Sequence, residues 1–350
     1  MIRSRFPCLA VLSSLLVTAC ASTLPPTKAT HAFDRRCLPA SMELRHMPIS
    51  GDEAVPRPHP AGQREAATKM YSPIAVNVAE AMDLLPLLNR LAELENQEAP
   101  PADVDRARRK LTTRLQLANL EVSSIVAEIE CEVQRADEVQ DRLKQEETKR
   151  TTSQTILGVI FGGLANILSG GISLATKAGD AAQIASVAGG AMEVLFGTSA
   201  NFTKVRQEFS HPHNHLKPFW DGAGMEDQFF SRGVWRFLTE PNIRDVEGHS
   251  LRDVLLATWN EEGRLGPPGS RQEKQRRELL FGEGGLYDSD DLHVREAMLH
   301  QLESSIQLMH QDLETLLREV LTRQALQEDR GEFGMSKRAE SSRAISWGER

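Results

Sequence analysis

The stretch LTTRLQLANLEVSSIVAEIECEVQRADEVQDRL, from Leu111 to Leu143, repeats its apolar residues at steps of three and four. Such steps place apolar side chains on one stripe of an α-helix, as in a coiled coil. Two consecutive steps of four meet at Ile129, a stutter that locally unwinds a supercoil. We therefore predict one helix from about Ala102 to Arg150. Its seam consists of Leu111, Leu115, Ala118, Val122, Ile125, Ile129, Val133, Ala136, Val139 and Leu143.

Two other stretches have the same period. Ser72-Pro73 is a typical helix start, and a seam follows it until Glu98, with a kink expected at Pro86. A third helix is expected from about Asp290 to Glu328. Its seam consists of Leu299, Leu302, Ile306, Met309, Leu313, Leu316 and Val320.

Long helices with one narrow apolar seam gain most of their stability from packing against a partner. We therefore predict an all-α fold built on a long antiparallel coiled-coil bundle. The long helices occupy residues 63–154 and 290–328, and a disordered tail is expected at 329–350. The pattern leaves open whether each seam packs within the chain or against a second copy.

The uncharged, glycine-rich stretch TILGVIFGGLANILSGGISLATKAG runs from Thr155 to Gly179. Small residues four apart let two helix backbones approach closely, which predicts a helical hairpin over residues 155–202. Two surroundings remain open, the interior of the protein and a membrane, because the segment is only marginally hydrophobic. The glycines expected at the helix contact are Gly158, Gly162, Gly171, Gly179 and Gly189.

Residues 203–289 contain most of the aromatic residues and predict a small helical subdomain. Ser250 and Ser270 begin segments that resemble capping boxes, and these short helices should end near Gly263 and Gly282. A further helix is expected from Met225 to Leu238. No strand-rich region is expected anywhere in the chain.

The first twenty residues, MIRSRFPCLAVLSSLLVTAC, combine a basic start with a short apolar region. This pattern is typical of a secretory signal and is too short for a stable membrane span. Val17-Thr18-Ala19-Cys20 resembles the lipobox of bacterial lipoproteins, which implies cleavage after residue 19 and lipidation of Cys20. Ala21, where an aspartate would favour the inner membrane, implies the outer membrane with the protein facing the periplasm. The alternative is an ordinary signal peptide followed by a chance cysteine.

The proline-rich residues 20–62 are expected to form a lipidated tether between the membrane and the folded part. Cys8 leaves with the signal peptide of residues 1–19, so Cys37 and Cys131 remain as the thiols of the mature chain. In an oxidising periplasm these two cysteines can form a disulfide. Two unpaired cysteines are the alternative.

His211, His213 and His215 are the candidate metal ligands, because alternating histidines can bind zinc or copper. The ligand set is incomplete, so we favour a solvent-exposed loop and expect neither a metal nor another cofactor. The net charge of -8 gives no reason to expect binding to nucleic acid. The sequence contains no recognisable catalytic motif, so we do not expect an enzyme.

These features predict a membrane-anchored envelope lipoprotein that acts as a structural or protein-interaction module. Its partners would be membrane lipid at Cys20 and another envelope protein or a second copy. The alternative is a membrane-perturbing or pore-forming protein that uses residues 155–196. The layout resembles multi-component α-helical pore-forming toxins in architecture, but no motif supports this, and the anchor and the 203–289 subdomain depart from their pattern.

Overall fold

The computed structural model describes residues 22–25, 37, 61–175, 204–211, 213–222, 229–241, 243 and 247–347. In this part of the chain there are nine helices and three strands, so the fold is mostly helical, as predicted, but not all-α. The chain divides into two compact units. Unit 1 comprises Met1–Arg36, Val133–Pro212 and Lys274–Ala297, and unit 2 comprises Cys37–Glu132, His213–Glu273 and Met298–Arg350.

The two longest helices, α7 (Pro101–Ala175) and α13 (Ser289–Trp347), contribute residues to both units. Every seam residue predicted for these two helices is buried, from Leu111 to Leu143 on α7 and from Leu299 to Val320 on α13. Both helices are longer than predicted. Helix α7 continues past Arg150, and α13 continues where a disordered tail was expected.

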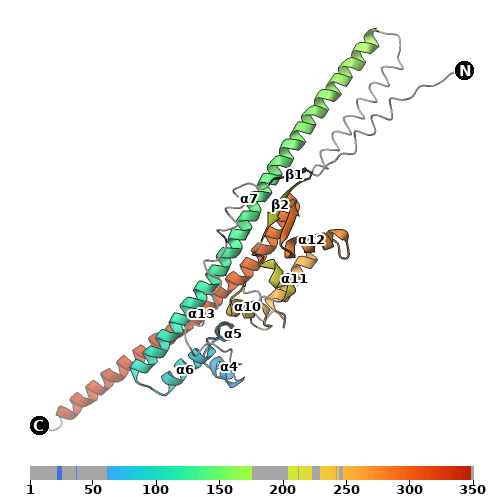
Figure 1. Ribbon diagram of the computed structural model, residues 1–350. Helices are drawn as coiled ribbons and strands as arrows, with labels where there is room; N and C mark the ends of the chain where they lie inside the picture. Colours follow the sequence, from blue (N-terminus) through green and yellow to red (C-terminus); the bar gives the residue numbers. More distant parts are fainter. Residues whose placement is uncertain are drawn as a thin grey trace. The chain divides into compact units, whose positions relative to one another are not determined.

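Unit 1 contains a three-stranded sheet that the sequence did not lead us to expect. Its strands are β1 (Ser22–Leu24), β2 (Val205–Ser210) and β3 (Gly284–Tyr287), in the order β1-β2-β3. Strand β1 is parallel to β2, and β3 is antiparallel to β2. The short strands are stabilised by partners far away in the sequence, which is why the local pattern did not reveal them. Figure 1 shows β1 and β2 beside α7, which continues beyond them.

Alternating side chains of β2 are buried, so one face of the sheet belongs to the core of unit 1. Phe209 packs edge-on against Tyr287 of β3, with ring centroids 5.6 Å apart. Gly284 lies so close to β2 that a Cβ atom would overlap the carbonyl oxygen of Phe209, and its φ of +115° is one that favours glycine. This glycine lets β3 begin directly against β2, just after the predicted helix end near Gly282.

Unit 2 contains the remaining short helices. They are α4 (Ala61–Thr68), α5 (Pro73–Ala81), α6 (Leu85–Asn96), α9 (Leu216–Asp221), α10 (Arg232–Thr239) and α11 (Leu251–Glu261). Helix α12 (Arg271–Phe281) begins in unit 2 and ends in unit 1. The core of unit 2 includes the fully buried Trp259, whose indole N–H donates to Gln301 at 2.7 Å.

The predicted helix starts are correct where they lie in described residues. Ser72 caps α5 by accepting the backbone N–H of Ala75, and Ser250 and Asp253 form a capping box at α11. Ser270 accepts the backbone N–H of Glu273 at 3.1 Å. At Pro86 the chain does more than kink. It breaks into α5 and α6, with Pro86 in the first turn of α6, where its missing N–H is not needed.

The predicted 203–289 subdomain is not one body. Its two ends, with β2 and β3, belong to unit 1, whereas residues 213–273 belong to unit 2. The helix expected from Met225 is observed only as α10, since residues 223–228 lie outside the described part. Pairing between β2 and β3 draws these two ends together.

Candidate functional site

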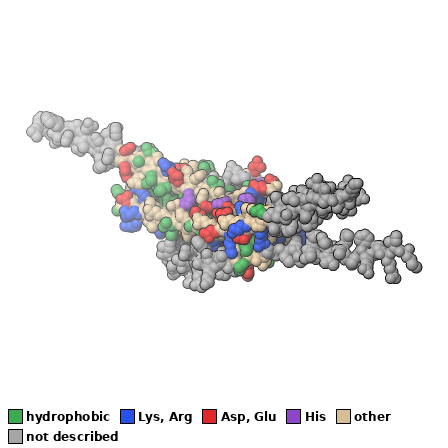
Figure 2. Space-filling model, turned by 90° about the horizontal axis from the view of Figure 1, so that it is seen from above, with side chains coloured by type: hydrophobic (Ala, Val, Ile, Leu, Met, Phe, Trp, Pro, Cys, Tyr) green, Lys and Arg blue, Asp and Glu red, His purple; other side chains and the backbone are tan. Residues whose placement is uncertain are grey.

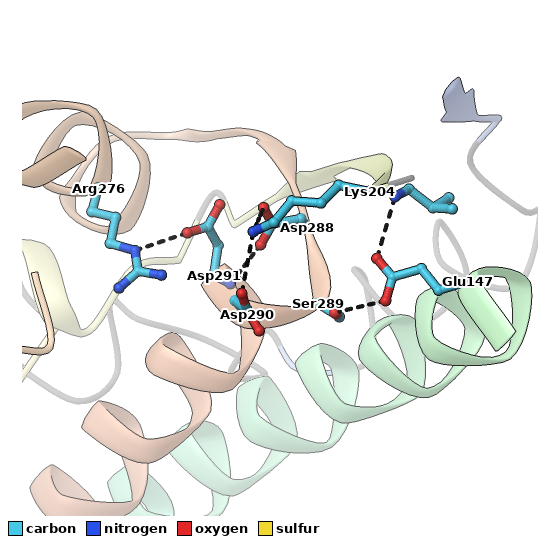
Figure 3. Close-up of polar contacts among 8 residues, drawn as sticks. Glu147, Lys204, Arg276, Asp288, Ser289, Asp290 and Asp291 are labelled. Atoms are coloured by element: carbon cyan, nitrogen blue, oxygen red, sulfur yellow. Dashed lines mark hydrogen bonds and ion pairs between the residues drawn. The ribbon is translucent and has the colours of Figure 1, made fainter. Parts of the chain in front are cut away.

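A polar network of unit 1 surrounds the start of α13 and Lys204 (Figure 3). Glu147 of α7 accepts two hydrogen bonds there, from the backbone N–H of Val205 at 3.2 Å and from the hydroxyl of Ser289 at 3.2 Å. One carboxylate thus joins α7, β2 and α13. It holds Val205, the first residue of β2, against the turn of α7 that contains Glu147.

Lys204 forms a second connection in this network. Its ammonium group lies 3.1 Å from Asp288 and 3.2 Å from Asp290. Burial alone would lower the pKa of Lys204, but the two carboxylates raise it above its ordinary value. Burial likewise opposes ionisation of Asp288, yet the N–H of Asp291 and the charge of Lys204 hold the pKa of Asp288 below its ordinary value.

The aspartates of this network also begin α13. Asp288 precedes the helix and accepts the backbone N–H of Asp291 at 3.0 Å, as an N-cap residue does. Asp291 pairs with Arg276 at 2.9 Å, but burial and the charge of Asp288 still raise the pKa of Asp291. The acidic cluster therefore suits a helix N-terminus, where negative charge is favourable.

Arg142, on α7, connects the other strand of the sheet. Its guanidinium donates to the side chain of Gln207 at 3.1 Å and to the carbonyl oxygen of Pro25 at 3.3 Å. Pro25 directly follows β1, so this arginine holds the end of β1 against α7. The junction formed by Glu147, Lys204, Arg142 and the α13 start is a clamp of hydrogen bonds and ion pairs, suited to holding chain segments together.

The sequence predicted none of the three clamp residues Glu147, Lys204 and Arg142. Glu147 and Arg142 lie in a long charged run, where nothing distinguishes them from solvent-exposed neighbours. Lys204 did carry a usable signal, because it is the first charged residue after the apolar stretch that ends near Phe196. Its partners could only be found once β2 and α13 were placed.

The histidines of the predicted loop do not form one site. His211 and His215 are buried, at 1% exposure each, so the expected solvent-exposed loop is wrong. His211 belongs to unit 1, whereas His213 and His215 belong to unit 2. Among the residues that the structure describes, no group of three or more His, Cys, Asp or Glu side chains is placed to hold a metal ion.

His211 lies in a neutral hydrogen-bond chain. Its Nε2 atom is 2.8 Å from the hydroxyl oxygen of Tyr287, and that hydroxyl donates to the carbonyl oxygen of Leu279 at 2.8 Å. The tyrosine oxygen therefore accepts, and His211 carries its proton on Nε2. Burial and the nearby charge of Arg295 lower the pKa of His211 to about 2.

His215 lies between two carboxylates of α7. Its Nδ1 atom is 3.0 Å from Glu132, and its Nε2 atom is 3.5 Å from Glu128, a distance at which attraction between charges dominates over hydrogen bonding. Burial would lower the pKa of His215, but the two carboxylates raise it to about 9. The rings of Phe229 and Phe230 pack against the imidazole, with centroids 5.9 and 5.7 Å away.

The disulfide proposed from the cysteine count is present in unit 2. Cys37 and Cys131 are bonded, with their Cα atoms 5.5 Å apart. Cys131 lies on α7 immediately before Glu132, so the disulfide and the charged histidine stabilise the same turn of the helix. The bond joins residues with a sequence separation of 94.

Other predicted site residues lie partly or wholly outside the described part of the chain. Cys20, Gly179 and Gly189 are outside it. Gly158, Gly162 and Gly171 lie within the helical backbone of α7, but the packing predicted for them is not described. In the part of the chain whose side chains are described, no helix is both long enough and apolar enough to cross a membrane.

Acidic and basic side chains are interspersed among the described residues on the face drawn in Figure 2. Comparison with protein-family models, with curated proteins and with solved structures found no match. The physical features of the two units are therefore the basis for assigning a function.

Proposed function

We propose that this protein is a membrane-anchored envelope lipoprotein that acts as a structural or protein-interaction module. The observation that carries the proposal is the Cys37–Cys131 disulfide. A disulfide is typical of an oxidising compartment such as the periplasm, and the lipobox-like Val17-Thr18-Ala19-Cys20 supplies both the export signal and the anchor. The outer membrane, with the protein facing the periplasm, is the location that Ala21 favours.

We further propose that α7 and α13 pair as an antiparallel coiled coil. Their polar contacts support this. In unit 2, Arg108 contacts Gln327 and Asn119 contacts His310, while in unit 1 Gln140 contacts Glu296. Residue numbers on α13 fall as those on α7 rise, which is the order that antiparallel helices require. The buried seams lie on these same helices.

A module of long paired helices suits a partner that binds along a helix surface. Exposed leucines are available for this on both long helices: Leu120 is 65% exposed on α7, and Leu326 is 56% exposed on α13. We expect another envelope protein or a second copy of the chain as the partner. Crosslinking in intact cells, followed by purification of the crosslinked complex, identifies which of the two is present.

The anchor is tested by metabolic labelling with a fatty-acid analogue. Replacement of Cys20 by Ala should abolish the labelling, because the thiol of Cys20 is the proposed lipid attachment site. The matched control is Cys8→Ala. Cys8 lies in the apolar part of the signal, so its replacement should leave the labelling unchanged. Labelling that survives in the Cys20→Ala variant contradicts the proposed anchor.

A second candidate function, perturbation of membranes, is favoured by one observation. Helix α7 runs without a break through Thr151 to Ala175, a segment that contains no charged residue. Leakage from vesicles on addition of the soluble, unlipidated protein would favour this function over the structural module. Intact vesicles at every pH and lipid composition tried would reject it.

A further inference from the structure

Strand β2 runs antiparallel to α7 along its whole length. Three contacts from different levels of the helix establish this order: Glu147 to Val205, Arg142 to Gln207, and Arg135 to the carbonyl oxygen of Ser210 at 2.8 Å. Moving backwards along β2, from residue 210 to residue 205, therefore means moving forwards along α7. Beyond Glu147 in that direction lies the end of α7 at Ala175.

Strand β1 has the same direction as β2, and therefore also runs antiparallel to α7. It pairs in parallel with β2, with Ser22 opposite Val205 and Leu24 opposite Gln207. The contact of Arg142 with the carbonyl oxygen of Pro25 fixes the far end of β1 at the level of Gln207. The N-terminal end of β1, at Ser22, is therefore the end nearer to the end of α7.

Cys20 is two residues before Ser22. At about 3.3 Å per extended residue, these two residues span at most about 7 Å. A helix rises about 1.5 Å per residue, so this distance corresponds to about five residues of α7 beyond Glu147. Covalent reach alone therefore keeps Cys20 within about 7 Å of Ser22, and the pairing of Ser22 with Val205 puts Ser22 level with Glu147.

The charge pattern of α7 changes close to this level. Lys149 and Arg150 are its last charged residues, and none follows before Ala175. The uncharged end is about 38 Å long by helical rise. Basic side chains next to an uncharged segment are suited to the headgroup region, where they contact anionic lipid.

We propose that the uncharged end of α7, residues 151–175, contacts the same bilayer that holds the acyl chains of Cys20. The proposal rests on the lipoprotein function proposed above. The lipidated residue is two residues from an end of β1 that lies level with Glu147, close to where α7 loses its charges, so the anchor and the uncharged helix contact one membrane. The proline-rich segment follows β1 in the chain, so it does not separate unit 1 from the membrane.

The anchor also explains how a marginally hydrophobic segment is retained in lipid. A segment rich in glycine, with Asn166 in its middle, has weak membrane affinity on its own. Covalent attachment of the acyl chains close to the segment gives it a high effective concentration at the bilayer, so a weak second contact is sufficient. The acyl chains supply the binding, and the helix sets the orientation of unit 1.

A fluorophore at a single cysteine tests the proposal in the full, lipidated chain. The mature protein offers no competing thiol, because Cys20 carries lipid and Cys37 and Cys131 form a disulfide. Leu164→Cys places the probe in the uncharged end of α7, and Leu168→Cys provides a second position one turn further on. The matched control is Gln145→Cys, an exposed position in the charged part of the same helix.

The labelled proteins are reconstituted into vesicles and exposed to two quenchers, iodide in the water and bromine on the lipid acyl chains. We expect the probes at 164 and 168 to lose fluorescence to the brominated lipid and to resist iodide, and the probe at 145 to do the reverse. Quenching at 164 and 168 by iodide alone, or by neither quencher as in a protein core, overturns the proposal. Fatty-acid labelling of the same samples keeps the two questions apart. If Cys20 is labelled and the helix is not in contact with lipid, only this proposal fails, whereas absent labelling refutes the anchor itself.

Discussion

Unit 1 keeps His211 neutral, whereas unit 2 keeps His215 charged, although the two residues are close neighbours in the sequence. Both imidazoles are buried, so desolvation acts on both in the same direction. The difference lies in what faces them. Arg295 adds positive charge near His211, and two carboxylates of α7 flank His215. Two histidines of one alternating motif, His211 and His215, thus have opposite charge states, because they pack in different units.

The disulfide gives the largest expected difference between the units. Replacing both Cys37 and Cys131 by Ser should destabilise unit 2 by about 4–5 kcal/mol, because a crosslink that closes so long a loop strongly restricts the unfolded chain. Hydrogen exchange followed by mass spectrometry should show faster exchange in peptides of unit 2. The control is the parent protein without these substitutions. If both thiols of the native parent protein are freely alkylated, the disulfide is absent and the expected loss of stability has no cause.

Loss of the buried ion pair between His215 and Glu132 in unit 2 should have the next largest effect on stability. Glu132→Gln removes the carboxylate nearest to His215 and leaves a buried charge with poorer compensation, which should cost about 3 kcal/mol. Chemical denaturation measures the loss. Glu314→Gln, an exposed position on α13 of the same unit, should change stability by less than about 0.5 kcal/mol. Equal effects of the two substitutions would show that the burial of Glu132 is energetically unimportant.

The two histidines should respond to pH in opposite directions. The folded pKa of His211 is about 2, below the ordinary value of 6.5, so the unfolded chain binds more protons as the pH falls below 6.5. Between pH 6.5 and pH 5 this should cost unit 1 about 2 kcal/mol. The folded pKa of His215 is about 9, so its stabilisation of unit 2 is complete below pH 6.5 and is lost as the pH rises to 9.

Nitrogen-15 NMR of the imidazole rings measures these protonation states directly. At pH 7.5 we expect His215 to be protonated on both nitrogens and His211 only on Nε2. Variants His211→Gln and His215→Gln assign the signals. Two similar titration curves for His211 and His215, both with midpoints near 6.5, would remove the contrast between the units.

The smallest expected effect concerns helix starts. Ser250→Ala removes the capping box of α11 in unit 2 and should destabilise it by about 1 kcal/mol. Asp288→Ala should cost more, because Asp288 caps α13 in unit 1 and also pairs with Lys204. Thermal unfolding of the two variants, each compared with wild type, ranks them. A larger loss at Ser250 would mean that the clamp at Lys204 adds nothing to the cap.

Much of the helical part could be predicted because its signals are local. The seams of α7 and α13 depend only on a period of three to four residues, and all of the predicted seam positions on these two helices are buried. The starts at Ser72 and Ser250 depend on residues within one turn. The seam expected after Ser72-Pro73 is also buried at Val78, Ala81, Leu85, Leu88 and Ala92. Only its first apolar residue, Ile74, is 50% exposed.

The sheet and the clamp could not be predicted, because their partners are distant in the sequence. Ser22 and Val205 have no local pattern that joins them, and Glu147 resembles every other glutamate of its charged run until Val205 is placed beside it. For the same reason the 203–289 segment was taken as one helical subdomain. Its end strands pair with each other across more than seventy residues, which no local pattern indicates.

The sequence by itself determined the long helices, their caps and their buried seams, since each of these follows from the spacing of neighbouring residues along one helix. It also supplied the two cysteines that form the disulfide. Only the tertiary structure decided that β1 joins the sheet of unit 1, that Glu147 holds β2 to α7, and that His211 is neutral while His215 is charged. These outcomes depend on burial and on charges brought together from separate parts of the chain, and a one-dimensional pattern contains neither.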